Sequence, residues 1–134
     1  MKQKTKYLSS YGRKKSLKNK GVIIDSANRN KLITSGTKEN WKHFMCKAAC
    51  FYTLRMNGQE CLSEAEVNNG IADIYWVDEK TVIEFEKNGS NKADKLKQYE
   101  SIYVNDVFVF VLDKIPDDFY QAVHFLKKQL GLEL

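Results

Sequence analysis

The sequence predicts an α/β domain whose mixed central sheet is flanked by helices. Apolar residues recur at spacings of three and four in three segments, which is typical of helices, and four short runs rich in Val, Ile, Phe and Tyr are typical of strands. In chain order these segments form an α-β-β-β-α-β core followed by a C-terminal helix. With 134 residues, 43% of them hydrophobic, the chain is long enough for one core and too short for two. We therefore expect a single domain over 21–134, preceded by a separate arm over 1–20.

The first helix is expected to begin after Thr37, a residue type that caps helices, and to end at Asn57-Gly58. Its apolar residues share one face: Trp41, Phe44, Met45, Ala48 and Tyr52. Another face carries possible metal ligands: Glu39, His43, Cys46 and Cys50. One helix face cannot surround a tetrahedral ion, so we interpret the two cysteines as packing residues.

The two later helices have clearer limits. Ser90 or Asn91 can cap the second helix, which is expected to turn Lys92 and Lys95 outward. Its inward residues are Ala93, Leu96, Tyr99 and Tyr103. Asp117, just after Pro116, is expected to cap the last helix, and Gly131 to end it. The apolar face of that helix consists of Phe119, Val123, Leu126 and Leu130.

Three predicted strands, separated by turn residues, follow the first helix: Cys61–Val67, Ile71–Val77 and Thr81–Lys87. In the first of them, Leu62, Glu64 and Glu66 alternate with Ser63, Ala65 and Val67. The continuous apolar run Val107–Leu112 is typical of a central strand covered on both faces. Two short β-prone runs within 21–36 suggest a hairpin or an irregular lead-in.

Charge is distributed unevenly along the chain. Residues 1–20 hold eight Lys or Arg and no acid, which leaves 14 basic and 17 acidic residues in 21–134, a balance of about −3. Such an arm can neutralise phosphates, and its Lys14, Lys15 and Lys18 are candidate DNA contacts. A solvated, flexible terminus is the alternative interpretation.

Nothing in the composition indicates a membrane or secreted protein. No apolar run approaches the roughly 18 residues needed to span a bilayer, and no apolar segment follows the basic N-terminus. Three cysteines without paired spacing predict neither a disulfide framework nor a zinc ribbon. We expect a cytoplasmic protein, in the host cytoplasm if it is viral.

Two predicted strands carry carboxylates where apolar residues are expected. Glu84 and Glu86 share one face of their strand, and Asp73 can lie across from them on the neighbouring strand. Buried carboxylates are costly unless a cation or hydrogen bonds compensate them. Hard oxygen ligands in this arrangement suit Mg²⁺ or Mn²⁺, so the pattern predicts a metal site at a sheet edge. The alternative is an exposed face lined with acids for solubility.

The order of elements together with Asp73, Glu84 and Glu86 resembles the PD-(D/E)XK, or restriction-endonuclease-like, nuclease superfamily, which includes archaeal Holliday junction resolvases. That family has an α-β-β-β-α-β core, an acid in the second strand and an acid-x-lysine signature in the third. Asp73 and Glu84 match the two acids, whereas Glu86 stands in the lysine position. Some restriction enzymes of the family carry Glu-x-Glu there, and a lysine from the next helix, Lys92 or Lys95, could replace the missing one.

The resemblance also implies an acid on the first helix or first strand. Glu64 is favoured by its spacing before Asp73, and Glu39 is the other candidate. For Glu39, Glu64 and Glu66 an ordinary solvated acid is an equally good interpretation.

The expected function is that of a metal-dependent DNA endonuclease that hydrolyses phosphodiester bonds and selects structure or strand ends more than sequence. Asp73, Glu84, Glu86 and the backbone carbonyl of Phe85 would hold one or two Mg²⁺ or Mn²⁺ ions. Cutting both strands of a duplex would need two sites, hence a homodimer. Two alternatives stay open: a non-catalytic DNA-binding or assembly module on a degenerate nuclease fold, and an RNA-processing nuclease.

Overall fold

The computed structural model describes residues 7–8, 22–23, 27–34, 36, 39–68, 70–88 and 92–132. The strands are β1 (Tyr7–Leu8), β2 (Val22–Ile23), β3 (Cys61–Val67), β4 (Gly70–Trp76), β5 (Thr81–Glu86) and β6 (Asp106–Val111). The helices are α2 (Trp41–Met56), α3 (Lys92–Gln98), the short 3₁₀ helix η3 (Leu112–Lys114) and α4 (Phe119–Gln129). The predicted α/β class and the order of core elements are confirmed.

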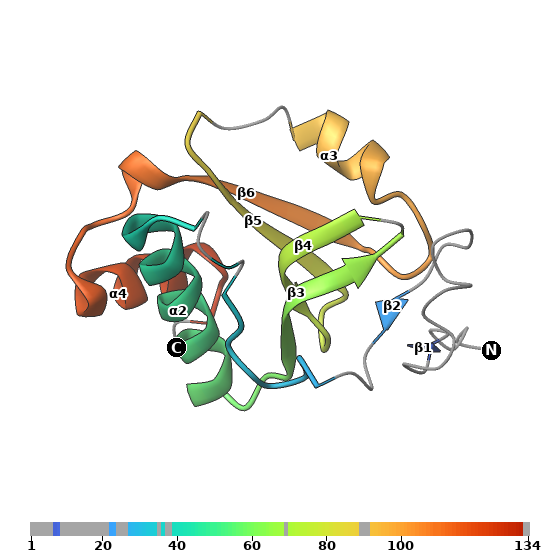
Figure 1. Cartoon of the computed structure of the whole chain (residues 1–134), viewed down its shortest axis with the longest axis horizontal. Helices are drawn as coiled ribbons and strands as arrows, with labels where there is room; N and C mark the ends of the chain where they lie inside the picture. Colours follow the sequence, from blue (N-terminus) through green and yellow to red (C-terminus); the bar gives the residue numbers. More distant parts are fainter. Residues whose placement is uncertain are drawn as a thin grey trace.

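The strands form one mixed sheet in the order β1-β2-β3-β4-β5-β6 (Figure 1). Strand β4 is antiparallel to both of its neighbours, β3 and β5. Strand β6 runs parallel to β5, and α3 lies in the connection between them. The prediction that Val107–Leu112 forms a central strand is wrong, because β6 is the last strand of the sheet. A continuous apolar run indicates that both faces of a strand are covered. It does not indicate whether another strand pairs along each of its two sides.

Two hydrophobic clusters lie on the two faces of the sheet, as the alternation of Val82 and Ile83 between them shows. The first cluster joins α2 and α4 to one face, and these two helices lie side by side (Figure 1). The second cluster covers the other face and includes Tyr99 and Tyr103, which are buried as predicted but follow the end of α3, whereas they were predicted to lie within that helix. The site-bearing strands β4 and β5 are therefore held between two packed layers.

Helix α2 presents a different face to the core from the one its apolar spacing predicts. Trp41 is 64% exposed and Tyr52 is 41% exposed, so both were wrongly predicted to be buried. The buried residues are Cys46, Lys47, Ala49, Cys50, Thr53 and Leu54. Most of these side chains are small, so the helix can pack closely on the sheet, while Trp41 and Tyr52 lie on its outer side. The helix begins at Trp41 with Asn40 as its N-cap, whereas Thr37 lies outside the described residues.

Helix α3 is rotated relative to the prediction. Ala93 and Leu96 are exposed, although both were predicted to point inward. Lys95 was predicted to point outward, yet its side chain is only 18% exposed. The reason is electrostatic, because this lysine lies against acids of β5. Ser90 and Asn91, the predicted caps, lie outside the described residues.

Helix α4 is capped at both ends. Asp118 accepts a hydrogen bond from the backbone N–H of Gln121, so it is the N-cap in place of the predicted Asp117. At the C-terminal end, Gly131 has φ 71°, a left-handed conformation that costs glycine nothing. The N–H of Gly131 bonds the carbonyl of Lys128 and that of Leu132 the carbonyl of Lys127, which is a Schellman motif. The predicted end of the helix is confirmed.

Of the two forms predicted for 21–36, a hairpin or an irregular lead-in, the described residues of this segment fit the second. Val22 of β2 pairs with Val67 of β3, and Arg29 makes an isolated bridge to Leu62. Tyr7–Leu8 pairs in parallel with β2, so part of the predicted arm joins the sheet. Across the described parts of the chain, no helix combines the length and apolar character needed to cross a membrane.

Candidate active site

The candidate site lies in a gap between β4 and β5. These strands pair from Trp76–Thr81 to Ile74–Ile83, and the next two residues, Asp73 and Glu84, are not paired through their backbones. Their side chains bridge the gap instead. Glu84 Oε2 accepts a hydrogen bond from the N–H of Asp73 at 3.1 Å, and Asp73 Oδ2 accepts one from the N–H of Phe85 at 2.7 Å. Both predicted acids therefore face each other between two inner strands, and not at a sheet edge.

Helix α3 adds a cation to this pair, and the residue that follows the helix adds a phenol. Lys95 Nζ lies 2.9 Å from Glu86 Oε2 and 3.6 Å from Glu84 Oε1. The hydroxyl of Tyr99 donates to Glu84 Oε1 at 2.8 Å. Lys95 thus bridges the two glutamates of β5, which point to the same side of the strand as predicted.

Burial and neighbouring charges shift the pKa values of several groups around the two acids. Glu84 is only 7% exposed, and burial together with the charge of Asp73 raises its pKa. Burial and the charge of Glu84 likewise raise the pKa of Tyr99, so its hydroxyl stays protonated and keeps donating. Burial alone would lower the pKa of Lys95, but its contacts with Glu86 and Glu84 outweigh this and raise it. Negative charge is concentrated at Asp73 and Glu84, and a cation placed there would relieve it.

On the α2 side of the gap, His43 contacts Asp73. His43 Nε2 lies 3.2 Å from Asp73 Oδ1, and its Nδ1 contacts Glu39. The hydrogen bond to Asp73 raises the pKa of His43 to about 9, against the opposing effect of burial. A protonated imidazole donates from both nitrogens, which matches an acid at each end.

A second ion cluster continues beneath His43. Lys47 is fully buried, and its Nζ lies 3.0 Å from Glu39 and 3.6 Å from Glu64. Burial raises the pKa of Glu64, although Lys47 opposes the shift. Glu64 therefore lies close to Asp73 but faces α2.

The backbone at Glu64 explains this orientation. Its φ of 47° is unusual for a residue other than glycine, and it lies between the paired positions Ser63–Ile74 and Ala65–Ala72. The predicted strict alternation of this strand is wrong, because Leu62 and Ala65 belong to the same cluster. A break at Glu64 turns its carboxylate toward Lys47.

Comparisons of the chain with models of known families, with curated proteins and with solved structures gave no match. The interpretation of the site therefore rests on its residues and geometry.

Most of the sequence-predicted site residues come together. Asp73, Glu84, Glu86 and Lys95 lie in one group, and Glu64 lies at its margin beside Lys47. Lys92 begins α3, but the placement of its side chain is not described. The predicted DNA contacts of the arm, Lys14, Lys15 and Lys18, lie outside the described residues.

The sequence interpretation missed Lys47 and did not assign the roles of two further residues: His43 was considered only as a metal ligand on the first helix, and Tyr99 only as a buried residue. Glu39, His43 and Lys47 recur at a spacing of four, which places alternating charges along one side of a helix. Because the large apolar residues of α2 suggested a different inner face, this polar spacing was not interpreted as buried. Tyr99 was expected to be buried, but the carboxylate partner of its hydroxyl had no sequence signal.

The donor set can be tested against a divalent metal. Within the described residues, no three His, Cys, Asp or Glu side chains are placed to hold an ion jointly. Mg²⁺ commonly takes only one or two protein carboxylates, and water and substrate phosphate complete its shell. Asp73 and Glu84 provide two such carboxylates, and burial of Glu84 beside the charge of Asp73 raises its pKa, an effect that a bound cation would oppose. The residues present thus fit Mg²⁺ or Mn²⁺ in kind and in number.

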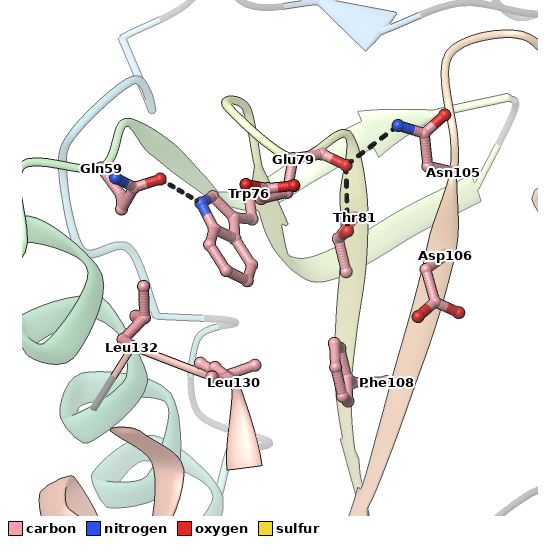
Figure 2. Close-up of a pocket in the computed structure, with 10 residues that line it drawn as sticks. Gln59, Trp76, Glu79, Thr81, Asn105, Asp106, Phe108, Leu130 and Leu132 are labelled. Atoms are coloured by element: carbon pink, nitrogen blue, oxygen red, sulfur yellow. Dashed lines mark hydrogen bonds between the residues drawn. The ribbon is translucent and has the colours of Figure 1, made fainter. Parts of the chain in front are cut away.

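A separate pocket lies at the other end of these strands. Its volume is about 410 Å³, and Trp76, Thr81 and Phe108 line it together with the end of α4 (Figure 2). The indole of Trp76 donates to Gln59 there, and the backbone carbonyl of Glu79 accepts from Thr81 and Asn105. These polar groups are hydrogen-bonded to one another, so we interpret them as structural. The acids of the strand gap remain the candidate site.

Proposed function

We propose that this chain is a metal-dependent DNA endonuclease that hydrolyses phosphodiester bonds. One observation carries the proposal: Asp73 and Glu84 face each other in the strand gap, with Lys95 beside them. Two neighbouring acids beside a lysine suit phosphoryl transfer, because the acids can hold a metal ion and the lysine can offset the charge of an anionic substrate.

The resemblance to the PD-(D/E)XK superfamily supports the proposal. The elements α2, β3, β4, β5, α3 and β6 follow the α-β-β-β-α-β order of that family's core. Asp73 lies in the second of these strands and Glu84 in the third. The family signature expects a lysine where this chain has Glu86. Lys95, which contacts that glutamate, is the substitute that we propose.

Each residue of the site has a distinct role in this proposal. Asp73 and Glu84 would hold Mg²⁺ or Mn²⁺, with Glu86 and the carbonyl of Phe85 as further oxygen donors. When bound, the ion would supply a Lewis acid for the phosphoryl oxygen and lower the pKa of an attacking water. Lys95 offsets the negative charge that develops on the phosphate, and Glu86 orients or deprotonates the water. Glu64 acts from the margin of the site, through its contact with Lys47.

DNA would be engaged mainly through phosphate contacts. The candidate phosphate contacts come from two parts of the chain. Helix α3 begins with Lys92 and brings Lys95 to the border of the site, and the basic arm contributes Lys14, Lys15 and Lys18. Phosphate contacts position a duplex but do not read its sequence. We therefore propose selection of structure or strand ends, and a homodimer where both strands are cut.

The test is cleavage of branched, duplex and single-stranded DNA, and of RNA, with Mg²⁺ or Mn²⁺. Wild type is compared with Glu84→Gln, which keeps the shape of the side chain, and with Glu100→Gln as an exposed control. We expect metal-dependent cleavage of DNA that falls by about 100-fold or more in Glu84→Gln and is unchanged in the control. Equal cleavage by Glu84→Gln would refute the site.

Other results of the same assay would favour the alternatives. Binding of DNA by wild type without cleavage in either metal would favour the non-catalytic module. Cleavage confined to RNA would favour the RNA-processing nuclease.

The role of Lys95 has its own experiment. Lys95→Met should lose cleavage, and Glu86→Lys in that background should restore part of it, because a lysine then returns to the family position. Lys97→Met, an exposed lysine of the same helix, is the matched control. If Lys95→Met cleaves as wild type does, Lys95 is not the substitute.

A further inference from the structure

Strand β6 forms an edge of the sheet, and after Asp106 at its start it carries no charged residue, proline or glycine. It pairs with β5 on one side, and no strand of the described chain pairs with its other side. Edge strands normally carry charged residues or proline because their free N–H and C=O groups otherwise pair with another chain.

A groove runs along this edge. Its volume is about 340 Å³, and one wall is formed by the five consecutive residues 107–111. Phe125 and Gln129 of α4 form the opposite wall, and Lys114 and Ile115 lie at the end where β6 leaves the sheet. Such a groove can pair with the backbone of an added strand and take up its alternate side chains.

The sequence of the edge is complementary to itself. Residues 107–111 are Val-Phe-Val-Phe-Val, which reads the same in both directions. An antiparallel copy of β6 would therefore oppose residues of the same kind around Val109. Asp106 stands at the start of the strand, and Lys114 lines the groove just after its end, next to the exposed Asp113. Antiparallel pairing around Val109 brings Asp106 of each copy to the end of the groove that Lys114 of the other copy lines.

We propose that a second copy of this chain occupies the groove, and that two β6 strands pair antiparallel across a two-fold axis to make one sheet shared by both chains. The pairing is isologous, since each copy offers the same edge. The homodimer suggested above for duplex cleavage has no stated interface, and this edge provides one. The pairing does not depend on any activity of the acid site.

Another exposed apolar surface provides the control. Tyr52 and Met56 of α2 and Tyr120 of α4 are exposed, and Phe119 contacts both tyrosine rings. Nothing on that surface complements itself in charge or sequence. A substitution on that surface removes apolar area comparable to that lost in a β6 substitution, but it leaves the edge of the sheet unchanged.

The first experiment is sedimentation equilibrium over roughly 1–100 μM, a range in which a modest interface dissociates. Wild type is expected to dimerise, Val109→Lys to lower the association constant by about tenfold or more, and Tyr120→Lys to leave it unchanged. Circular dichroism confirms that each variant is folded. A monomeric wild type, a Val109→Lys variant that still dimerises, or loss of the dimer in Tyr120→Lys would each overturn the proposal.

A charge exchange tests the antiparallel direction. Asp106→Lys and Lys114→Asp should each weaken the dimer, because each places like charges together at both ends of the interface. The double variant should recover most of the association. Additive losses in the double variant would show that the two residues do not meet across the axis. Neither experiment uses cleavage, so the dimer and the proposed nuclease can fail separately.

Discussion

At the scale of single residues, Lys47 shows how the site is supported from below. Its side chain is fully buried, and the carboxylates of Glu39 and Glu64 are its partners. A buried lysine is costly when alone, but removing it leaves two poorly solvated acids without their cation. Lys47 therefore ties the start of α2 to the distorted position in β3.

Replacing Lys47 by methionine is expected to lower the free energy of unfolding by about 3 kcal/mol, within the range found when one partner of a buried ion pair is removed. Urea denaturation measures the loss. Lys97→Met, an exposed lysine in α3, should change stability by no more than about 0.5 kcal/mol. Adding Glu64→Gln to Lys47→Met should recover part of the loss, and no recovery would show that Glu64 is not its partner.

His43 predicts a pH dependence of stability. Its pKa in the folded protein is about 9, above the ordinary value of 6.5, chiefly because of the hydrogen bond to Asp73. The stabilisation is therefore complete below pH 6.5 and is lost as the pH rises through 9, with a total of the order of 3 kcal/mol. Unfolding of the EDTA-treated protein should become easier across that interval.

The matching measurement is an NMR titration of the imidazole. Asp73→Asn should bring the pKa of His43 back toward 6.5, since it removes the negative charge and replaces a charge-assisted hydrogen bond by a weaker one to a neutral amide oxygen. A folded-state pKa at or below 6.5 in the wild type would contradict the arrangement of His43 between Asp73 and Glu39.

At the scale of elements, two adjacent aspartates at the start of α4 have different roles. Asp118 caps the helix, whereas Asp117 contacts Lys42 on the surface and is 78% exposed. Asp118→Ala should cost about 1 kcal/mol, as loss of an N-cap does, and Asp117→Ala less than about half of that. Thermal or urea unfolding of the two variants gives the comparison, and the reverse order would show that the sequence-based choice of Asp117 was correct.

Elements were easier to predict than the faces they bury. The limits of β3, β4, β5 and the end of α4 follow from turn residues and from Gly131, which act locally. The inner faces of α2 and α3 do not, because they depend on what lies opposite. Small residues of α2 allow that helix to pack against the sheet. In α3, Lys95 points inward because its ammonium group contacts acids of β5. A helix pattern cannot report its partner's charge.

The same limit applies to the candidate site. Asp73, Glu84 and Glu86 could be found from sequence because carboxylates in apolar strands are unusual. Their arrangement in a strand gap could not be found, since it depends on side chains that replace ladder hydrogen bonds. Likewise, the positive φ at Glu64 that breaks the regular strand could not be predicted, because no glycine in the sequence marks that position.

At the scale of the whole molecule, the uneven charge predicts how the chain would bind DNA. The arm over 1–20 carries eight basic residues, while 21–134 has a slight excess of acids. Binding that depends on the arm releases counterions from the duplex, and each lost phosphate contact lowers the slope of log K against log salt by about 0.9.

Replacing Lys14, Lys15 and Lys18 by glutamine should therefore weaken duplex binding and reduce that slope by about 2 to 3, measured by fluorescence anisotropy at several salt concentrations. The matched control replaces three lysines of the folded domain by glutamine: Lys80, Lys127 and Lys128. Both triple variants lose the same net charge, so a general field effect would change them equally. A larger change in the arm variant assigns the phosphate contacts to the arm, and equal changes would mean that only the net charge of the molecule attracts DNA.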